Sequence, residues 1–429
     1  MLSFGTERRG RTALAALAAV PLIAMLVYLQ VGAPHLDHQA RAHLEIVRVL
    51  VAAGERFRLA VVAEDLWGNP TRIDRPLTIA SSRPIENLAA GIAASLHDGP
   101  CILDGLAVAE PGDVELRLSD AETGEELGRA NPLRAVAVTP LRHYWGDLHG
   151  QSGETVGTNP AESYFRYARD KAFIDIVGHQ GNDFQITDEF WQELNRLTAA
   201  FDEPGRFVCV PGYEWSGNTG MGGDRNVFHR REGRPIHRSS RILVPGQVPQ
   251  FEDCHTAKDL FRSLASEDAV VIAHVGGRYA DIRFAHDGRL ERAVEVHSTW
   301  GTFEWLLHDA FAQGYRVGVV CHSDDHKGRP GATRPGASTF GAIGGLTCYV
   351  MPELTRDALF AAVWPLAYTI YGLTRGAFDG VYPYFFTDPT RLSWPQVLFN
   401  MTGLMAAFFV GALALAMLDR TLRPAQARA

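Results

Sequence analysis

The sequence has few cysteines and almost no lysine. Its five cysteines lie far apart and include no Cys-X-X-Cys pair, so neither a disulfide framework nor a zinc ribbon is indicated. Only 3 of the 41 basic residues are lysines, and no block of basic residues forms a patch, which argues against a duplex nucleic-acid binder. With 46% apolar residues among 429, the chain has enough hydrophobic material for two or three folded domains and is not a disordered protein.

Two uncharged apolar segments lie near the ends of the chain. Residues 12–32 predict a transmembrane helix or signal anchor, with a cleaved signal peptide as the alternative. Residues 396–418 predict a second transmembrane helix, since they are long enough to cross a hydrocarbon core. Arginines flank both segments, so the positive-inside rule places residues 1–11 and 419–429 in the cytoplasm. Residues 377–395 are rich in aromatics and predict a juxtamembrane segment.

This topology predicts a place in the cell. The composition, rich in arginine and alanine and poor in lysine, is typical of a GC-rich bacterial genome. We therefore expect a protein of the bacterial inner (cytoplasmic) membrane, in contact with the lipid bilayer, whose soluble domains face the periplasm or the exterior.

Residues 42–140 alternate between apolar and polar side chains with the period of a strand. Phe57, Leu59, Val61 and Ala63 would share one face, and turn-forming Gly, Asn and Pro residues separate the runs. The spacing predicts a small all-β immunoglobulin-like sandwich. It has no cluster of His or paired carboxylates, so we expect a spacer or partner-binding module there.

Residues 141–376 alternate short apolar runs with helical ones, which predicts an α/β domain. One such helix begins after Thr187 and has Leu194 and Leu197 on its apolar face. Six candidate strands run into polar residues: His149 and Gln151; His179, Asn182 and Asp183; Glu214; His274; Glu295 and His297; and His322, Asp324, Asp325 and His326. Such residues converge where strands end, and imidazoles with carboxylates suit Mn, Zn or Fe. The alternative is that each is a structural hydrogen-bonding group.

Several of these residues stand in motifs. Asp147-Leu148-His149-Gly150-Gln151-Ser152 is similar to a DLHxHT opening, and Ser323-Asp324-Asp325-His326 is similar to a closing SDxH motif. His274 follows a strand, as the central His of such proteins does. With His179 and Glu214, this ordered set resembles the PHP (polymerase and histidinol phosphatase) superfamily, and within it a bacterial branch known as the domain-of-unknown-function 3604 family.

The resemblance implies a distorted seven-stranded (β/α) barrel that holds two or three divalent metal ions. The implied ligands are His149, Gln151, His179, Glu214, Asp224, His274, Asp324 and His326. Three positions depart from the family pattern. Gln151 replaces the second His of the HxH motif, Gly178 replaces the Asp of a TDH motif, and Asp224 stands where a His is expected.

The function implied is that of a membrane-anchored, metal-dependent hydrolase, most simply a phosphoesterase acting on a small-molecule or polymer phosphate ester. His297 and Asp325 are candidates for the general acid. Four basic residues beside the motifs are candidates for binding phosphate, with surface salt bridges as the alternative: Arg225, Arg278, Lys327 and Arg329. Two other functions stay open, a metal hydrolase of amide or ester bonds and a non-enzymatic envelope protein with a degenerate metal site.

Overall fold

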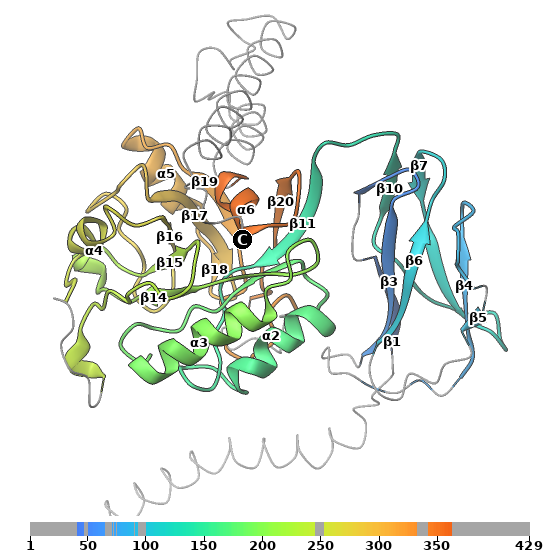
Figure 1. The fold of residues 1–429 in the computed structure, drawn as a ribbon, viewed down its shortest axis with the longest axis horizontal. Coiled ribbons are helices and arrows are strands. Elements are labelled where there is room, and N and C mark those ends of the chain that lie inside the picture. The colour runs from blue at the N-terminus through green and yellow to red at the C-terminus, as the bar shows by residue number, and fades with distance from the viewer. Residues whose placement is uncertain are drawn as a thin grey trace, which may run out of the picture.

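The computed structural model describes residues 41–46, 50–64, 71, 73, 75–89, 91–92, 100–244, 253–332 and 342–362. Figure 1 shows two parts, one built from strands alone and one in which helices pack beside sheets. Phe173 of the second part packs against Ala60 and Val62 of the first.

The predicted transmembrane segments, 12–32 and 396–418, and their flanks, 1–11, 377–395 and 419–429, lie outside the described residues. Within the described ranges, no helix is long and apolar enough to cross a membrane. The longest described helix, α3 (Asp188–Phe201), has 14 residues, whereas a membrane-spanning helix needs about 20. The described residues thus hold no membrane-spanning helix, contrary to the predicted anchored protein of the inner membrane, and no membrane anchor enters the proposals below.

The part built from strands spans the region predicted as a sandwich. Its strands are β1 (Arg41–Ile46), β2 (Leu50–Ala52), β3 (Arg56–Glu64), β4 (Leu77–Ser81), β5 (Gly91–Ile92), β6 (Cys101–Ala107), β7 (Gly112–Val114), β8 (Leu116–Asp120), β9 (Glu126–Arg129) and β10 (Leu133–Val136). They form sheets in the orders β1-β3-β6, β2-β10-β7 and β5-β4-β8-β9. Phe57, Leu59 and Val61 of β3 and Leu116 and Leu118 of β8 share one buried cluster, as expected when sheets pack face to face.

The second part contains two further sheets and five α-helices among its described residues. Its strands are β11 (Arg142–Asp147), β12 (Ile176–Gly178), β13 (Val208–Val210), β14 (Gly212–Trp215), β15 (Arg225–His229), β16 (Ala269–Ala273), β17 (Glu291–Ser298), β18 (Gly301–Thr302), β19 (Gly318–Cys321) and β20 (Thr347–Met351). The other helices are α2 (Ala161–Asp170), α4 (Ala257–Ser263), α5 (Glu304–Ala312), α6 (Arg356–Ala362) and the 3₁₀ turns η2 (Thr219–Met221) and η3 (Arg241–Leu243).

The prediction of a seven-stranded (β/α) barrel is wrong, because the described strands do not form one closed ring. One sheet has the order β13-β12-β11-β20, and the other has β14-β15-β16-β17-β18 with β19 also paired to β17. Pro211 separates β13 from β14 and has no N–H to donate to a ladder. The sheets also touch through isolated bridges, Gly150 with Asp325 and Asn182 with Glu214. β15 is antiparallel to both of its neighbours, which a (β/α) barrel does not allow.

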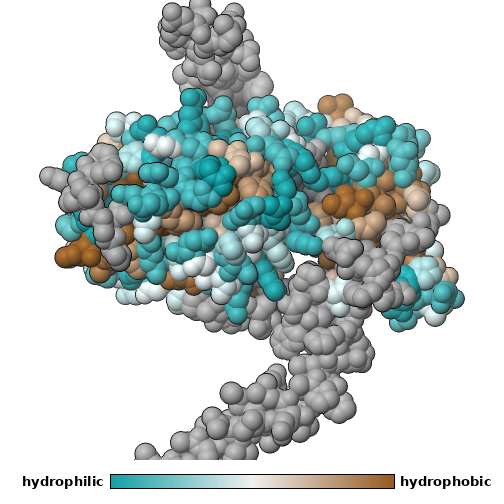
Figure 2. All heavy atoms as spheres, turned by 60° about the horizontal axis from the view of Figure 1, so that its bottom comes forward, coloured by the Kyte–Doolittle hydropathy of each residue, from teal (hydrophilic) through white to brown (hydrophobic). Residues whose placement is uncertain are grey.

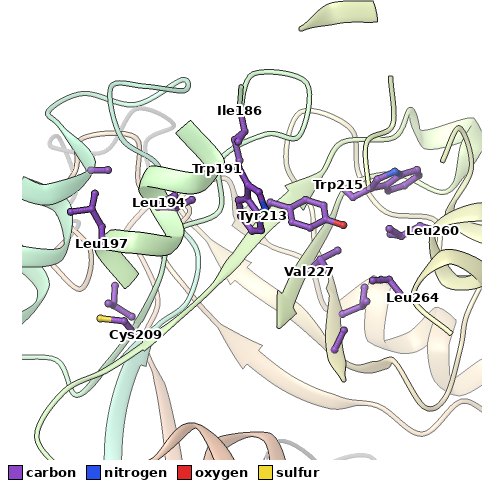
Figure 3. Packing of buried hydrophobic residues seen from close by; sticks show 14 of the residues in the cluster. Ile186, Trp191, Leu194, Leu197, Cys209, Tyr213, Trp215, Val227, Leu260 and Leu264 are labelled. Carbon is purple, nitrogen blue, oxygen red and sulfur yellow. The ribbon is translucent and has the colours of Figure 1, made fainter. Parts of the chain in front are cut away.

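A large apolar cluster lies beside both of these sheets. It includes Val177 and Cys209 of the first sheet, Tyr213 and Val271 of the second, and side chains of α2, α3 and α4. The helix α3 begins at Thr187, whose side chain accepts a hydrogen bond from the N–H of Phe190 at 3.1 Å. Figure 3 shows Trp191 of α3 next to Tyr213 of β14, and their rings meet edge to face at 5.7 Å. On the face shown in Figure 2, hydrophilic side chains predominate and apolar ones are interspersed among them.

Candidate metal centre

Five candidate ligands come together at one edge of the two sheets. His149 follows β11, His274 follows β16, and Asp324 lies just after β19, so parallel strands deliver all three. Glu214 lies in β14, which runs in the same direction as β16 because both are antiparallel to β15. Asp224 reaches the same edge from the beginning of β15, since Arg225 pairs with both Trp215 and Ala273.

The distances are those of ligands that converge on a common point. His149 Nε2 lies 3.2 Å from Asp324 Oδ1 and 3.9 Å from Glu214 Oε2. His274 Nε2 lies 3.8 Å from the other oxygen of Glu214. Two groups of ligand atoms each lie within 4.8 Å of one another: His149, His274 and Asp324; and Glu214, Asp224 and His274.

Several ligand atoms of the first group are buried without the hydrogen-bond partners that buried polar atoms normally have. His149 Nε2, both ring nitrogens of His274 and Asp324 Oδ1 are buried and have no hydrogen-bond partner in the described part of the chain. Leaving such atoms unsatisfied costs roughly 1–3 kcal/mol each. Imidazole nitrogens and a carboxylate are a ligand set that suits Zn, Mn or Fe, so these residues fit a divalent ion.

A second layer fixes the orientation of His149. Its Nδ1 lies 2.9 Å from Glu295 Oε1, and His322 Nδ1 lies 2.9 Å from Oε2 of the same carboxylate. Because an ionised carboxylate can only accept, both Nδ1 atoms carry the proton, and Nε2 of His149 is left as the ligand atom. His322 Nε2 in turn accepts from the hydroxyl of Tyr349 at 2.9 Å.

In the sequence, Glu295 lies within a candidate strand and His322 at the end of another, and no role was predicted for either. The signal for Glu295 is a carboxylate within the apolar run of β17, where it is 1% exposed. A buried acid in such a position needs a specific partner.

The pKa values in this centre are shifted by burial and by nearby charges. Burial and the nearby His149 lower the pKa of His274 to about 4, and burial raises that of Asp324 to about 6. Burial alone would lower the pKa of His149, but Asp324 and Glu295 outweigh it and raise that pKa well above the usual value. A bound cation would favour the neutral imidazoles and ionised carboxylates that ligation requires.

The backbone of Asp324 is in the left-handed region, with φ of 50°. For a residue other than glycine this conformation stores strain that surrounding contacts must hold. The carbonyl of Asp324 accepts from Thr299 Oγ1 at 3.3 Å and from His326 Nδ1 at 2.9 Å. The strain thus lies at the residue whose carboxylate points at His149.

An open cavity of about 610 Å³ leads to this centre. Its lining residues are Gln151, Val156, Thr158, Asn182, Phe184, Glu214, Gly276, Gly277, Arg278, Trp300, Asp324, His326 and Lys327. The cations Arg278 and Lys327 therefore face the same space as two candidate ligands, Glu214 and Asp324.

Three predicted ligands have other partners. Gln151 Oε1 accepts from Thr155 Oγ1 at 2.8 Å, which turns its NH₂ toward Asn182 and Glu214. His179 bonds to Ser152 Oγ at 2.8 Å, and His326 lines the cavity with Nδ1 on the Asp324 carbonyl. None of the three is in the two ligand groups found among the described residues.

The two predicted general acids also have structural partners. His297 contacts Thr302 Oγ1 at 2.8 Å and the Ile343 carbonyl at 2.9 Å, and it does not line the cavity. Asp325 accepts from the backbone N–H of Arg329 at 2.6 Å and shapes the loop after β19. Their catalytic role stays a prediction.

The four predicted phosphate-binding residues divide into two pairs. Arg278 and Lys327 line the cavity. Arg225 is fully buried, 2.8 Å from Glu291, and donates to the carbonyls of Gly222 and Gly223, so it holds the start of β15. Arg329 is outside the cavity lining.

Part of the chain is similar to known protein sequences. Residues 126–277 match the model of a family described as "Protein of unknown function (DUF3604)". Uncharacterized proteins of Chlamydia pneumoniae and Chlamydia trachomatis are 25% and 26% identical over 261 and 264 residues, which is 59% of this chain. These matches cover only 40% of each relative. The D00-D0 domain of Intimin, at TM-score 0.19 and 17% identity over 23% of this chain and 48% of that one, is too distant to support an argument. The family match includes His149, Glu214, Asp224 and His274 and ends before Asp324.

Proposed function

We propose that this chain is a metal-dependent hydrolase related to the PHP superfamily, and that its substrate is a phosphate ester. The observation that carries the proposal is the group of His149, His274 and Asp324. Its buried ligand atoms have no hydrogen-bond partner in the described ranges and lie beside an open cavity. Buried groups of this kind are commonly functional.

Each residue of the centre and of the cavity has a proposed role. His149, His274 and Asp324 would hold a divalent ion, which supplies an activated water and positive charge for a hydrolytic reaction. Glu295 keeps the proton of His149 on Nδ1. Arg278 and Lys327 are placed to bind an anionic group in the cavity, which favours a phosphate over an uncharged amide or ester.

The test is metal content and hydrolysis measured on the same preparations of the full chain. His149→Ala and Asp324→Asn remove one ligand each, and His308→Ala changes an exposed histidine of α5 as the control. We expect the wild type and the control to bind a divalent ion and to hydrolyse a phosphomonoester or phosphodiester. Both ligand variants should lose metal and activity together. An absence of bound metal after loading with Mn²⁺, Zn²⁺ or Fe²⁺ would overturn the proposal.

A further inference from the structure

The guanidinium of Arg278 lies between two candidate ligands. Its Nε is 2.8 Å from Asp224 Oδ1, and its NH2 is 3.6 Å from Glu214 Oε1. The backbone N–H of Arg278 donates to Asp224 Oδ2 at 3.0 Å, so both oxygens of this carboxylate are engaged by one residue. The guanidinium also lies over the ring of Phe184, 5.2 Å from its centroid.

Asp224 and Glu214 are the carboxylates of the second ligand group, with His274 as its third member. An ion there would share the two carboxylates with the fixed charge of Arg278, at distances where like charges repel strongly in a buried site. The guanidinium of Arg278 already supplies one positive charge to this pair. Among the described residues, no arginine or lysine pairs with the first group, which also has two unpartnered atoms that the second group lacks, His149 Nε2 and Asp324 Oδ1.

The other side of Glu214 is also closed to an ion. Gln151 Nε2 donates to Glu214 Oε2 at 3.3 Å and to Asn182 Oδ1 at 3.2 Å. The orientation of the amide is fixed because Thr155 donates to its oxygen. The NH₂ group of Gln151 therefore faces Glu214, at the position where the family motif has a histidine that could bind a metal ion.

From this geometry we propose that the chain binds a single divalent ion, at His149, His274 and Asp324, and that the Arg278 guanidinium supplies the second positive charge, between Asp224 and Glu214. This inference rests on the proposed function and replaces the two or three ions that the family resemblance implies. Since the Arg278 side chain is 29% exposed and lines the cavity, it can also meet an anionic substrate beside the ion.

The experiment counts ions in the full chain after loading with Mn²⁺ and removal of the excess. Arg278→Met removes the charge and keeps an apolar stem against Phe184, while Arg283→Met is the control, because Arg283 pairs with Asp281 and Asp309 away from the cavity. The readouts are elemental analysis and the Mn²⁺ electron paramagnetic resonance spectrum, which distinguishes an isolated ion from a coupled pair.

We expect one ion for each chain and an uncoupled spectrum in the wild type and in Arg283→Met. In Arg278→Met we expect a second ion to bind at Asp224 and Glu214, which then lack their arginine partner. Asp224→Asn should keep one ion, because Asp224 serves Arg278 and not the resident ion. Two or more ions in the wild type, or loss of the ion in Asp224→Asn, would overturn the inference while leaving the proposed function intact. An absence of metal in every sample would instead overturn the proposed function.

Discussion

His149 and Glu295 form a buried pair, with His149 Nδ1 2.9 Å from Glu295 Oε1 and both side chains at most 1% exposed. Their positions are 146 residues apart in the sequence, and each comes from a different sheet. The pair sets which nitrogen of His149 faces Asp324, so the centre depends on a residue that offers no ligand itself.

Glu295→Gln should therefore weaken metal binding without removing a ligand. The amide offers only one acceptor oxygen to the two Nδ1–H groups of His149 and His322. We expect the affinity for Zn²⁺ to fall by about 10–100-fold, measured by competition with a chelating dye. Glu304→Gln, at an exposed position on α5, is the matched control. Equal affinities in both variants would show that Glu295 does not position His149.

Metal removal should lower the thermal stability of the wild type. When the free concentration of an ion that binds only the folded chain is a thousand times its Kd, the free energy of unfolding rises by about 4 kcal/mol. We expect a chelator to lower the Tm of the wild type and to leave the Tm of Asp324→Asn unchanged, in scans by circular dichroism. A chelator effect of the same size in both proteins would mean that the ion binds elsewhere.

The packing of α3 predicts a large loss of stability in Trp191→Ala. Trp191 is 8% exposed, contacts the Tyr213 ring and donates from Nε1 to the Arg234 carbonyl at 2.9 Å. We expect the free energy of unfolding to fall by about 3–5 kcal/mol in a denaturant titration. Trp305→Ala, at a residue that is 39% exposed, should cost much less. Similar costs for both would contradict the packing in Figure 3.

His229 should make the protein less stable in mild acid. Burial lowers its pKa to about 4, and neither ring nitrogen has a hydrogen-bond partner in the described ranges. Between the unfolded value of about 6.5 and that folded value, the unfolded chain binds the extra proton, so stability rises with pH. The contribution is fully present above pH ~6.5 and is lost as the pH falls toward 4.

His229→Phe keeps a ring against Tyr213 and removes this titration. We expect its free energy of unfolding to fall less steeply than that of the wild type between pH 6.5 and 4, in denaturant titrations at several pH values. His179 and His274 also have a pKa of about 4 and keep part of the slope in both proteins. Parallel curves for the two proteins would show that His229 is protonated without cost.

The sequence predicted the strands and helices that depend on residues close together in the chain. The alternation of Phe57, Leu59 and Val61 placed all three in one core, and Thr187 begins α3 as its N-cap. The convergence of His149, Glu214, His274 and Asp324 followed from their positions near strand ends and is what the structure has.

The reversal before β15 could not be predicted in this way. Gly222 and Gly223 have φ of 120° and 75°, and a Cβ at Gly223 would collide with the carbonyl of Tyr279. This turn makes β15 antiparallel and brings Asp224 to the centre from the beginning of a strand. It also breaks the expected barrel pattern.

The partners of the arginines depend on contacts between distant parts of the chain, which spacing does not show. Arg225 and Arg278 both stand beside motifs, yet one is buried against Glu291 and the other lies in the cavity wall. The role of Glu295 is hidden for the same reason, since its partner His149 follows a strand of the other sheet.

Anomalous X-ray diffraction tests most directly whether His149, His274 and Asp324 hold a divalent ion. Crystals of the full chain loaded with Zn²⁺ would be measured on both sides of the zinc absorption edge. We expect an anomalous peak within bonding distance of His149 Nε2, a ring nitrogen of His274 and a carboxylate oxygen of Asp324. A map with no peak at these three side chains would contradict the proposed metal site.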